Sequence, residues 1–170
     1  YALAVYPSFD LNDFANVENA SVFRNPLVEN VYEMGSIIKP LTLSAGIDGG
    51  AVTAQTTYYD AGFIERDGYT ISNFAKKGRG TVSMQEVLNQ SLNTGAAFIA
   101  EKVGREKFAQ YLHSFGLGEE TGIDLPGEVP GLIDNLDSPR DVEHITAAFG
   151  QGIAVTPIAM TRALASLANG

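Results

Sequence analysis

The sequence predicts a helix-rich α+β fold in which the sheet is small for its helices. Apolar residues recur at helical spacing in several segments after residue 81, whereas β-branched and aromatic runs are confined to residues 1–6 and 56–73. The chain has 170 residues, of which 45% are apolar, and this size suits one domain or a large piece of one. We therefore expect one partial domain, 1–170, with several sheet strands missing from the chain.

The N-terminal elements are predicted to be a strand, an irregular segment and a helix. Residues 1–6 form an apolar run closed by a proline, which predicts a buried strand. The segment 7–31 is rich in Asn, Asp, Ser and Pro, and we expect it to be irregular. A helix should begin beside Ser36 and end near Gly49-Gly50, because Pro40 is tolerated only close to a helix start.

A β-hairpin is predicted within residues 56–73. The runs Thr57-Tyr58-Tyr59 and Tyr69-Thr70-Ile71 flank Asp67-Gly68, a pair that favours a tight turn. The segment 76–80 that follows is basic and contains two glycines, so we expect a solvated, flexible link.

Helices are predicted for most of the remaining chain. Thr81 or Ser83 can cap the first of them, and the Thr156-Pro157 pair is a favourable start for the last. Residues 119–139 carry Gly and Pro repeatedly and indicate an ordered loop, with a short extended piece at 123–125. The predicted helices cover 84–88, 95–103, 105–115, 145–149 and 157–167.

Composition and charge narrow the range of functions. Acidic residues outnumber basic ones 20 to 11, which gives a net charge of −9 and a pI near 4.6. Because such a surface repels phosphate groups, we expect no nucleic-acid partner and no adhesion to anionic lipid. Cysteine is absent, and the two histidines, His113 and His144, are too few for a His-rich metal site. No apolar run reaches the ~18 residues needed to span a bilayer.

Ser36 and Lys39 form the first candidate catalytic pair. A lysine three positions after a serine lies on the same helix face, one turn away. In a partly desolvated cleft the amine can take the hydroxyl proton and make the serine a nucleophile. At a helix N-terminus the backbone N–H of Ser36 can also point at an oxyanion. The alternative reading is a capping serine followed by a solvated lysine.

Ser91-Leu92-Asn93 is the second candidate, on a predicted turn between two helices. A turn can present both polar side chains to one cleft, where Ser91 would relay a proton and Asn93 would hold Lys39 or a substrate amide. Ser and Asn are also ordinary turn and cap residues, so this motif carries weight only together with the first.

The two motifs in their contexts resemble those of the penicillin-binding proteins. The segment 32–40 (YEMGSIIKP) resembles the nucleophile segment of that family, and 91–95 (SLNTG) resembles its second motif. The resemblance covers essentially all 170 residues and is typical of the monofunctional, class B group. The flanking segments that agree with it are 6–10, 115–118, 121–128 and 150–157.

The resemblance implies a peptidoglycan DD-transpeptidase that needs no cofactor and no metal. Ser36 would attack the penultimate carbonyl of a stem peptide ending in D-Ala-D-Ala, with Lys39 as the base. Ser91 would pass a proton to the departing D-Ala, and Asn93 would position Lys39 and the substrate amide. A neighbouring stem-peptide amine would then resolve the acyl-enzyme into a cross-link. β-Lactam antibiotics would acylate the same serine.

The resemblance also implies a cellular setting. Members of the family are anchored in the bacterial cytoplasmic membrane and act on its outer, periplasmic face. They serve cell division or cell elongation, and we expect membrane glycosyltransferase, divisome or elongasome proteins as partners. The membrane anchor is expected to lie outside this chain.

One family motif is missing from the sequence, which contains neither Lys-Thr-Gly nor Lys-Ser-Gly. The nearest match, Lys76-Lys77-Gly78, has a different middle residue and lies between the first two motifs. We therefore expect the chain to start after the first strand of the domain and to end before the Lys-Thr-Gly strand. The isolated chain should be weakly active or inactive. Two alternatives stay open: a β-lactamase or β-lactam sensor domain, and a non-catalytic fragment that acts only with a partner chain.

Overall fold

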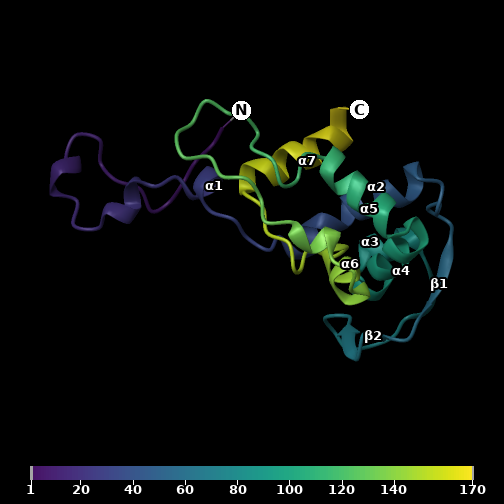
Figure 1. Cartoon of the computed structure of the whole chain (residues 1–170). Coiled ribbons are helices and arrows are strands. Elements are labelled where there is room, and N and C mark those ends of the chain that lie inside the picture. The colour runs from purple at the N-terminus through teal and green to yellow at the C-terminus, as the bar shows by residue number, and fades with distance from the viewer. Residues whose placement is uncertain (1, 170) are drawn as a thin grey trace.

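The computed structural model describes residues 2–169 and confirms the helix-rich α+β class (Figure 1). The α-helices are α1 (Pro26–Glu29), α2 (Lys39–Asp48), α3 (Met84–Asn89), α4 (Asn93–Val103), α5 (Arg105–Ser114), α6 (Asp141–Ala147) and α7 (Pro157–Asn169). Short 3-10 helices are η1 (Phe14–Asn16), η2 (Ala20–Phe23), η3 (Gly35–Ile38) and η4 (Asp134–Asp137). The helices α2 to α7 form the body of the molecule, and the N-terminal segment projects from it as an arm (Figure 1).

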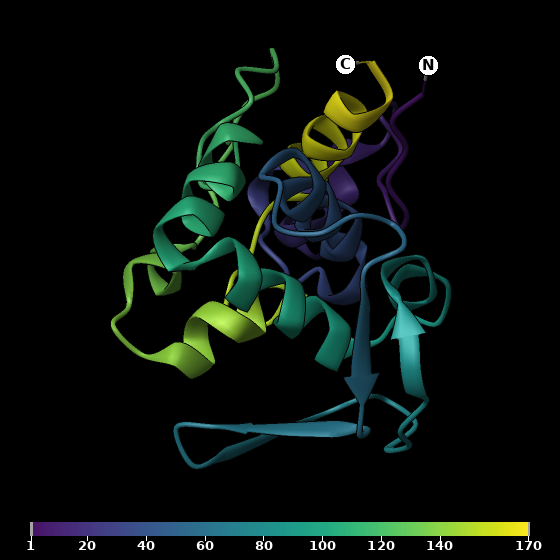
Figure 2. The same cartoon turned by 90° about the vertical axis from the view of Figure 1, so that its right-hand side faces the viewer.

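The strands form two small antiparallel sheets at one side of the helices (Figure 2). One sheet pairs β1 (Thr57–Asp60) with β4 (Gly80–Ser83), and the other pairs β2 (Phe63–Arg66) with β3 (Tyr69–Ser72). The predicted turn at Asp67-Gly68 is confirmed, because both residues have positive φ, 51° and 80°, as a tight two-residue hairpin turn requires.

The predicted partners of that hairpin were partly wrong. The strand opposite β3 is Phe63–Arg66, and residues 57–59 pair instead with the distant β4. A two-residue turn joins only the residues directly beside it, and the chain turns away from β1 at Gly62, whose φ is +90°. Phe63–Arg66 escaped notice because exposed Phe63 and Glu65 leave the strand without an apolar face.

The strand predicted at residues 1–6 was also wrong in its described part. Residues 2–6 form no strand, and Tyr6 is 97% exposed; Tyr1 lies outside the described residues. An apolar run becomes a strand only where an adjacent strand satisfies its backbone groups, and none lies beside it among residues 2–169. The segment 7–31 is largely irregular, as predicted, and carries only η1, η2 and α1.

The helix predictions hold apart from the ends. The helix expected to begin beside Ser36 starts as the 3-10 turn Gly35–Ile38 and is α-helical only from Lys39. Ser83 caps α3 by accepting a hydrogen bond from the backbone N–H of Glu86, whereas Thr81 lies within β4. The helix predicted at 145–149 lies earlier, at Asp141–Ala147, and 123–125 form no strand. The last helix begins at Pro157, as expected.

A buried core anchors the elements that carry the two motifs. Ile38 and Leu41, beside Lys39, are at most 1% exposed and belong to the main cluster. Leu92, in the second motif, is 2% exposed and belongs to a smaller cluster between α3 and α4. Each such side chain contributes about 1.5–3 kcal/mol on burial, so both motifs are held by their apolar neighbours.

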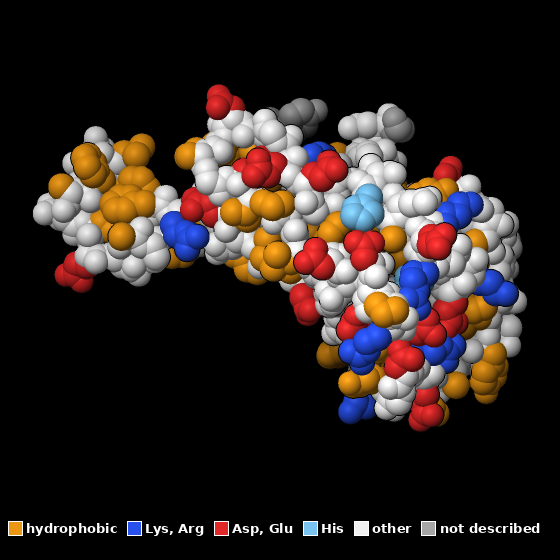
Figure 3. All heavy atoms as spheres, viewed as in Figure 1, with side chains coloured by type: hydrophobic (Ala, Val, Ile, Leu, Met, Phe, Trp, Pro, Cys, Tyr) orange, Lys and Arg blue, Asp and Glu red, His pale blue; other side chains and the backbone are white. Residues whose placement is uncertain are grey.

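On the face shown in Figure 3, acidic and basic side chains are interspersed over the helical body, and hydrophobic side chains gather on the projecting arm. Within residues 2–169, no helix combines the length and the apolar character that crossing a membrane demands.

Candidate active site

The amine of Lys39 lies at the centre of the candidate site. The residue is 3% exposed, although it opens a helix. Its Nζ lies 3.0 Å from Ser36 Oγ, 2.9 Å from Ser91 Oγ, 2.8 Å from Asn93 Oδ1 and 2.6 Å from the carbonyl oxygen of Ser91. The structure thus brings together all four residues that the sequence singled out, from segments more than 50 residues apart in the chain. Their catalytic roles stay predictions.

The backbone around Ser36 explains how serine and lysine meet. Residues 35–38 form a turn of 3-10 helix, in which side chains three positions apart are eclipsed. Lys39 therefore lies directly over Ser36. The entry to this turn is docked on another loop, because the N–H of Gly35 donates to the carbonyl of Gly150 at 3.1 Å. A Cβ atom on Gly150 would lie 2.6 Å from the nitrogen of Gly35, so only glycine permits this approach.

The second motif is a strained turn. Ser91 has a φ of +54°, which is uncommon for a residue with a side chain. This conformation directs both the carbonyl and the hydroxyl of Ser91 to the Lys39 amine. Asn93 starts α4, and its Nδ2 donates to the carbonyl of Ser72 at 2.9 Å, which turns its Oδ1 towards Lys39.

The electrostatic setting favours loss of a proton from Lys39. Burial lowers the pKa of this amine to about 8. Every polar contact of the amine is to a neutral oxygen, and within residues 2–169 no carboxylate forms a salt bridge with it. The amine is therefore a suitable general base for the Ser36 hydroxyl near neutral pH.

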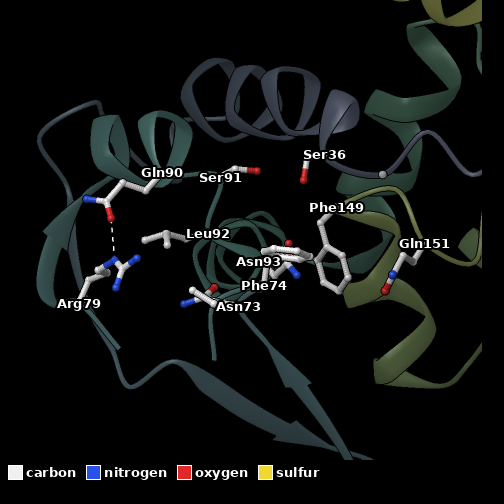
Figure 4. Close-up of a pocket in the computed structure, with 12 residues that line it drawn as sticks. Ser36, Asn73, Phe74, Arg79, Gln90, Ser91, Leu92, Asn93, Phe149 and Gln151 are labelled. Carbon is white, nitrogen blue, oxygen red and sulfur yellow. Dashed lines mark hydrogen bonds between the residues drawn. The ribbon is translucent and has the colours of Figure 1, made fainter. Parts of the chain in front are cut away.

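An open cleft of about 450 Å³ gives a substrate access to this group. Ser36 and Ser91 are exposed in it, and the Ser91 hydroxyl points towards Ser36 (Figure 4). The backbone N–H of Ser36 has no hydrogen-bond acceptor in the described part of the chain, so it is free to stabilise an oxyanion. Lining residues outside the two motifs are Asn73, Phe74, Ala75, Arg79, Gln90, Phe149 and Gln151.

These further lining residues were missed as site residues. Phe74 is 99% exposed beside the end of the hairpin, and the sequence carries no signal that distinguishes it from a core aromatic residue. Phe149 and Gln151 adjoin Gly150, whose contact with Gly35 brings them close to Ser36. The basic loop at 76–78 is exposed, as predicted. In the described range, no cluster of His, Asp and Glu could hold a metal ion.

Comparison with known proteins agrees with this geometry. The family model of the penicillin-binding protein transpeptidase domain matches residues 1–170. Stage V sporulation protein D of Bacillus subtilis is 38% identical over 96% of this chain and 26% of its own length. Peptidoglycan D,D-transpeptidase MrdA of Acinetobacter baumannii is 31% identical over 99% of this chain and 28% of its own. The chain thus spans about a quarter of the length of these curated relatives.

A solved structure gives the same result at the level of the fold. The transpeptidase domain of penicillin-binding protein 3 from Burkholderia pseudomallei superposes with a TM-score of 0.80 at 31% sequence identity. The match covers 85% of this chain and 44% of that one. Sequence and fold agree over most of the chain, and the chain belongs to the transpeptidase domain family of the penicillin-binding proteins.

Proposed function

We propose that this protein is a peptidoglycan D,D-transpeptidase, a serine acyltransferase that cross-links stem peptides. The observation that carries the proposal is the buried Lys39 amine, which contacts Ser36, Ser91 and Asn93 at once. Relatives named as D,D-transpeptidases over nearly the whole chain support the same reaction.

The proposed reaction proceeds in two acyl transfers. Ser36 Oγ attacks the carbonyl carbon of the penultimate D-Ala while Lys39 Nζ takes the hydroxyl proton. The oxyanion is stabilised by the N–H of Ser36. The C–N bond then breaks, and the proton passes from Lys39 through the Ser91 hydroxyl to the departing D-Ala amine. A second stem peptide's amine attacks the Ser36 ester, forms the new amide bond and restores the serine hydroxyl.

The proposal extends to inhibitors, location and partners. A β-lactam presents a strained amide to the same serine and leaves a stable ester, so penicillins should label Ser36. Because stem peptides lie outside the cytoplasmic membrane, the protein is proposed to act on the extracytoplasmic face, held there by a membrane anchor. Division or elongation proteins, including a glycosyltransferase, are the proposed partners. Relatives named as peptidoglycan D,D-transpeptidases support the action on peptidoglycan from which this setting is proposed.

Mass spectrometry of the full-length gene product after penicillin treatment tests the proposal. We expect a mass increase equal to one penicillin, on the peptide that contains Ser36. The variant Ser36→Ala should carry no adduct, whereas Ser8→Ala, a serine outside the cleft, should label as the wild type does. An adduct that survives Ser36→Ala would overturn the proposal.

The same experiment separates the alternative functions. A β-lactamase would release the penicilloyl group within the assay, whereas a transpeptidase retains it for many minutes. A non-catalytic fragment would show no adduct at all. The relatives' names favour the transpeptidase over both alternatives.

A further inference from the structure

A carboxylate outside the two motifs, that of Asp60 at the end of β1, is completely buried. Within residues 2–169 it has no salt-bridge partner. It accepts hydrogen bonds from neutral donors alone. These are the N–H of Gly62 at 2.9 Å, the N–H of Arg79 at 3.0 Å, the hydroxyl of Thr94 at 2.8 Å and Nδ2 of Asn73, which lies 3.0 Å from each carboxylate oxygen. Burying an acidic group without a cation is costly, so its presence here calls for a reason.

The first branch of this network passes through Asn73. Because Nδ2 of Asn73 points at Asp60, its Oδ1 faces the opposite way and accepts the backbone N–H of Thr94 at 3.2 Å. This N–H belongs to the first turn of α4, whose N-cap residue, Leu92, makes no side-chain cap hydrogen bond. Asn73 thus supplies the missing cap from the end of β3.

The second branch is the hydroxyl of Thr94, which is 2% exposed. Its single proton faces two acceptors, Asp60 Oδ1 at 2.8 Å and Asn73 Oδ1 at 3.1 Å, so its lone pairs accept the hydroxyl of Tyr58 at 3.1 Å. Burial raises the pKa of Tyr58 to about 12, so this phenol stays a donor. Thr94 follows Asn93 directly, and any shift of Thr94 moves the amide that holds Lys39.

A third branch reaches Arg79, which also lines the cleft. Asp60 accepts from the backbone N–H of Arg79, on its carboxylate and on its own carbonyl at 3.1 Å. Arg79, Asn73 and Asn93 all line the cavity around Ser91 (Figure 4). Asp60 is therefore a common hydrogen-bond acceptor for three segments that line the cleft, although it does not line the cleft itself.

We propose that Asp60 is a positioning residue of the acylation reaction, which sets the second motif against Lys39 through Asn73 and Thr94. The inference rests on the proposed transpeptidase function and deepens it. Such a residue acts on the geometry of the reacting groups, so its loss should slow the chemical step and leave initial binding of a penicillin unchanged.

Thr94 offers the sharpest test, because it has a matched pair of variants. Thr94→Val keeps the shape and removes the hydroxyl, whereas Thr94→Ser keeps the hydroxyl. Stopped-flow labelling of the full-length gene product with fluorescent penicillin yields the limiting acylation rate and the dissociation constant separately. We expect Thr94→Val to lower the limiting rate about ten- to a hundredfold and Thr94→Ser to restore most of it. Asp60→Asn replaces one accepting oxygen with an NH2 group that faces hydrogen-bond donors, so it should behave like Thr94→Val.

A control separates positioning from simple loss of stability. Leu112→Val, in the buried core of α5, should lower the melting temperature without lowering the acylation rate of the folded protein. Where Asp60→Asn does not fold, Thr94→Val alone decides. A Thr94→Val protein that acylates as fast as the wild type would overturn the inference, as would a Thr94→Ser protein as slow as Thr94→Val.

Failure of the inference and failure of the proposed function have different signatures. A wild-type protein that takes up no penicillin overturns the function. Amide hydrogen exchange then judges the inference on its own, since Asn73→Ala removes the cap of α4. Faster exchange of the Thr94 amide in Asn73→Ala supports the positioning network, and unchanged exchange overturns it.

Discussion

The rate of penicillin acylation should rise steeply with pH in a range set by Lys39. With its pKa at about 8, the amine is neutral in roughly a tenth of molecules at pH 7 and in roughly nine tenths at pH 9, so the rate should rise about tenfold. At its ordinary pKa of 10.5 only about one molecule in 3,000 would hold the base form at pH 7. Burial therefore supplies about 300-fold more base at pH 7.

The limiting acylation rate of the full-length gene product, measured from pH 6 to pH 9.5, tests this reasoning. Lys39→Arg keeps the positive charge, but a guanidinium does not release its proton in this pH range, so acylation should fall to background at every pH. Lys107→Arg is the matched control, because Lys107 is exposed on α5, away from the cleft. A profile that stays flat between pH 6 and pH 9 would refute the assignment of Lys39 as base, and so would a Lys39→Arg protein with the wild-type rise.

Three further predictions follow from the geometry. Gly150→Ala places a Cβ against Gly35 in a backbone with φ of +77°, and this conformation alone costs about 1–2 kcal/mol. The variant should show no penicillin labelling of Ser36 in a protein that still unfolds cooperatively. Burial lowers the pKa of His144 below its ordinary 6.5, so the unfolded chain takes up the proton first and the free energy of unfolding should fall as the pH drops from about 6.5. Urea denaturation at pH 7.5 and pH 5.5 should show a smaller loss of stability for His144→Gln than for the wild type. An equal loss would contradict this prediction. The isolated 170-residue chain, which contains no Lys-Thr-Gly, should acylate about a hundredfold more slowly than a family member that carries the motif, and equally fast labelling would contradict this.

Local chemistry explains what the sequence predicted correctly. The turn at Asp67-Gly68, the cap at Ser83 and the helix end near Gly49-Gly50 each depend on residues within a few positions of one another. The Ser36–Lys39 contact is local in the same sense. The meeting of this pair with Ser91 and Asn93 is not local, and it was inferred through the family resemblance rather than from spacing.

Features that depend on distant partners were beyond the sequence. The pairing of β1 with β4 and the lack of a strand at residues 2–6 are decided by which backbone edges lie nearby. Asp60 gave no signal, because an aspartate after exposed Tyr59 reads as a surface residue until the fold surrounds it with four donors. Phe149 reaches the cleft only through the contact of its neighbour Gly150 with Gly35.

The four oxygens around Lys39 determine which hydrogen bonds its amine donates and which it accepts once it is neutral. Two of them, the Ser91 carbonyl and Asn93 Oδ1, can only accept hydrogen bonds, whereas the two serine hydroxyls can also donate. Once the amine is neutral it keeps two N–H groups, which donate to the Ser91 carbonyl and to Asn93 Oδ1. Its one lone pair can then accept a hydrogen bond from either the Ser36 or the Ser91 hydroxyl, whose oxygens lie at 3.0 and 2.9 Å. The surroundings of the amine thus direct its electron pair to the two serine hydroxyls before any substrate arrives.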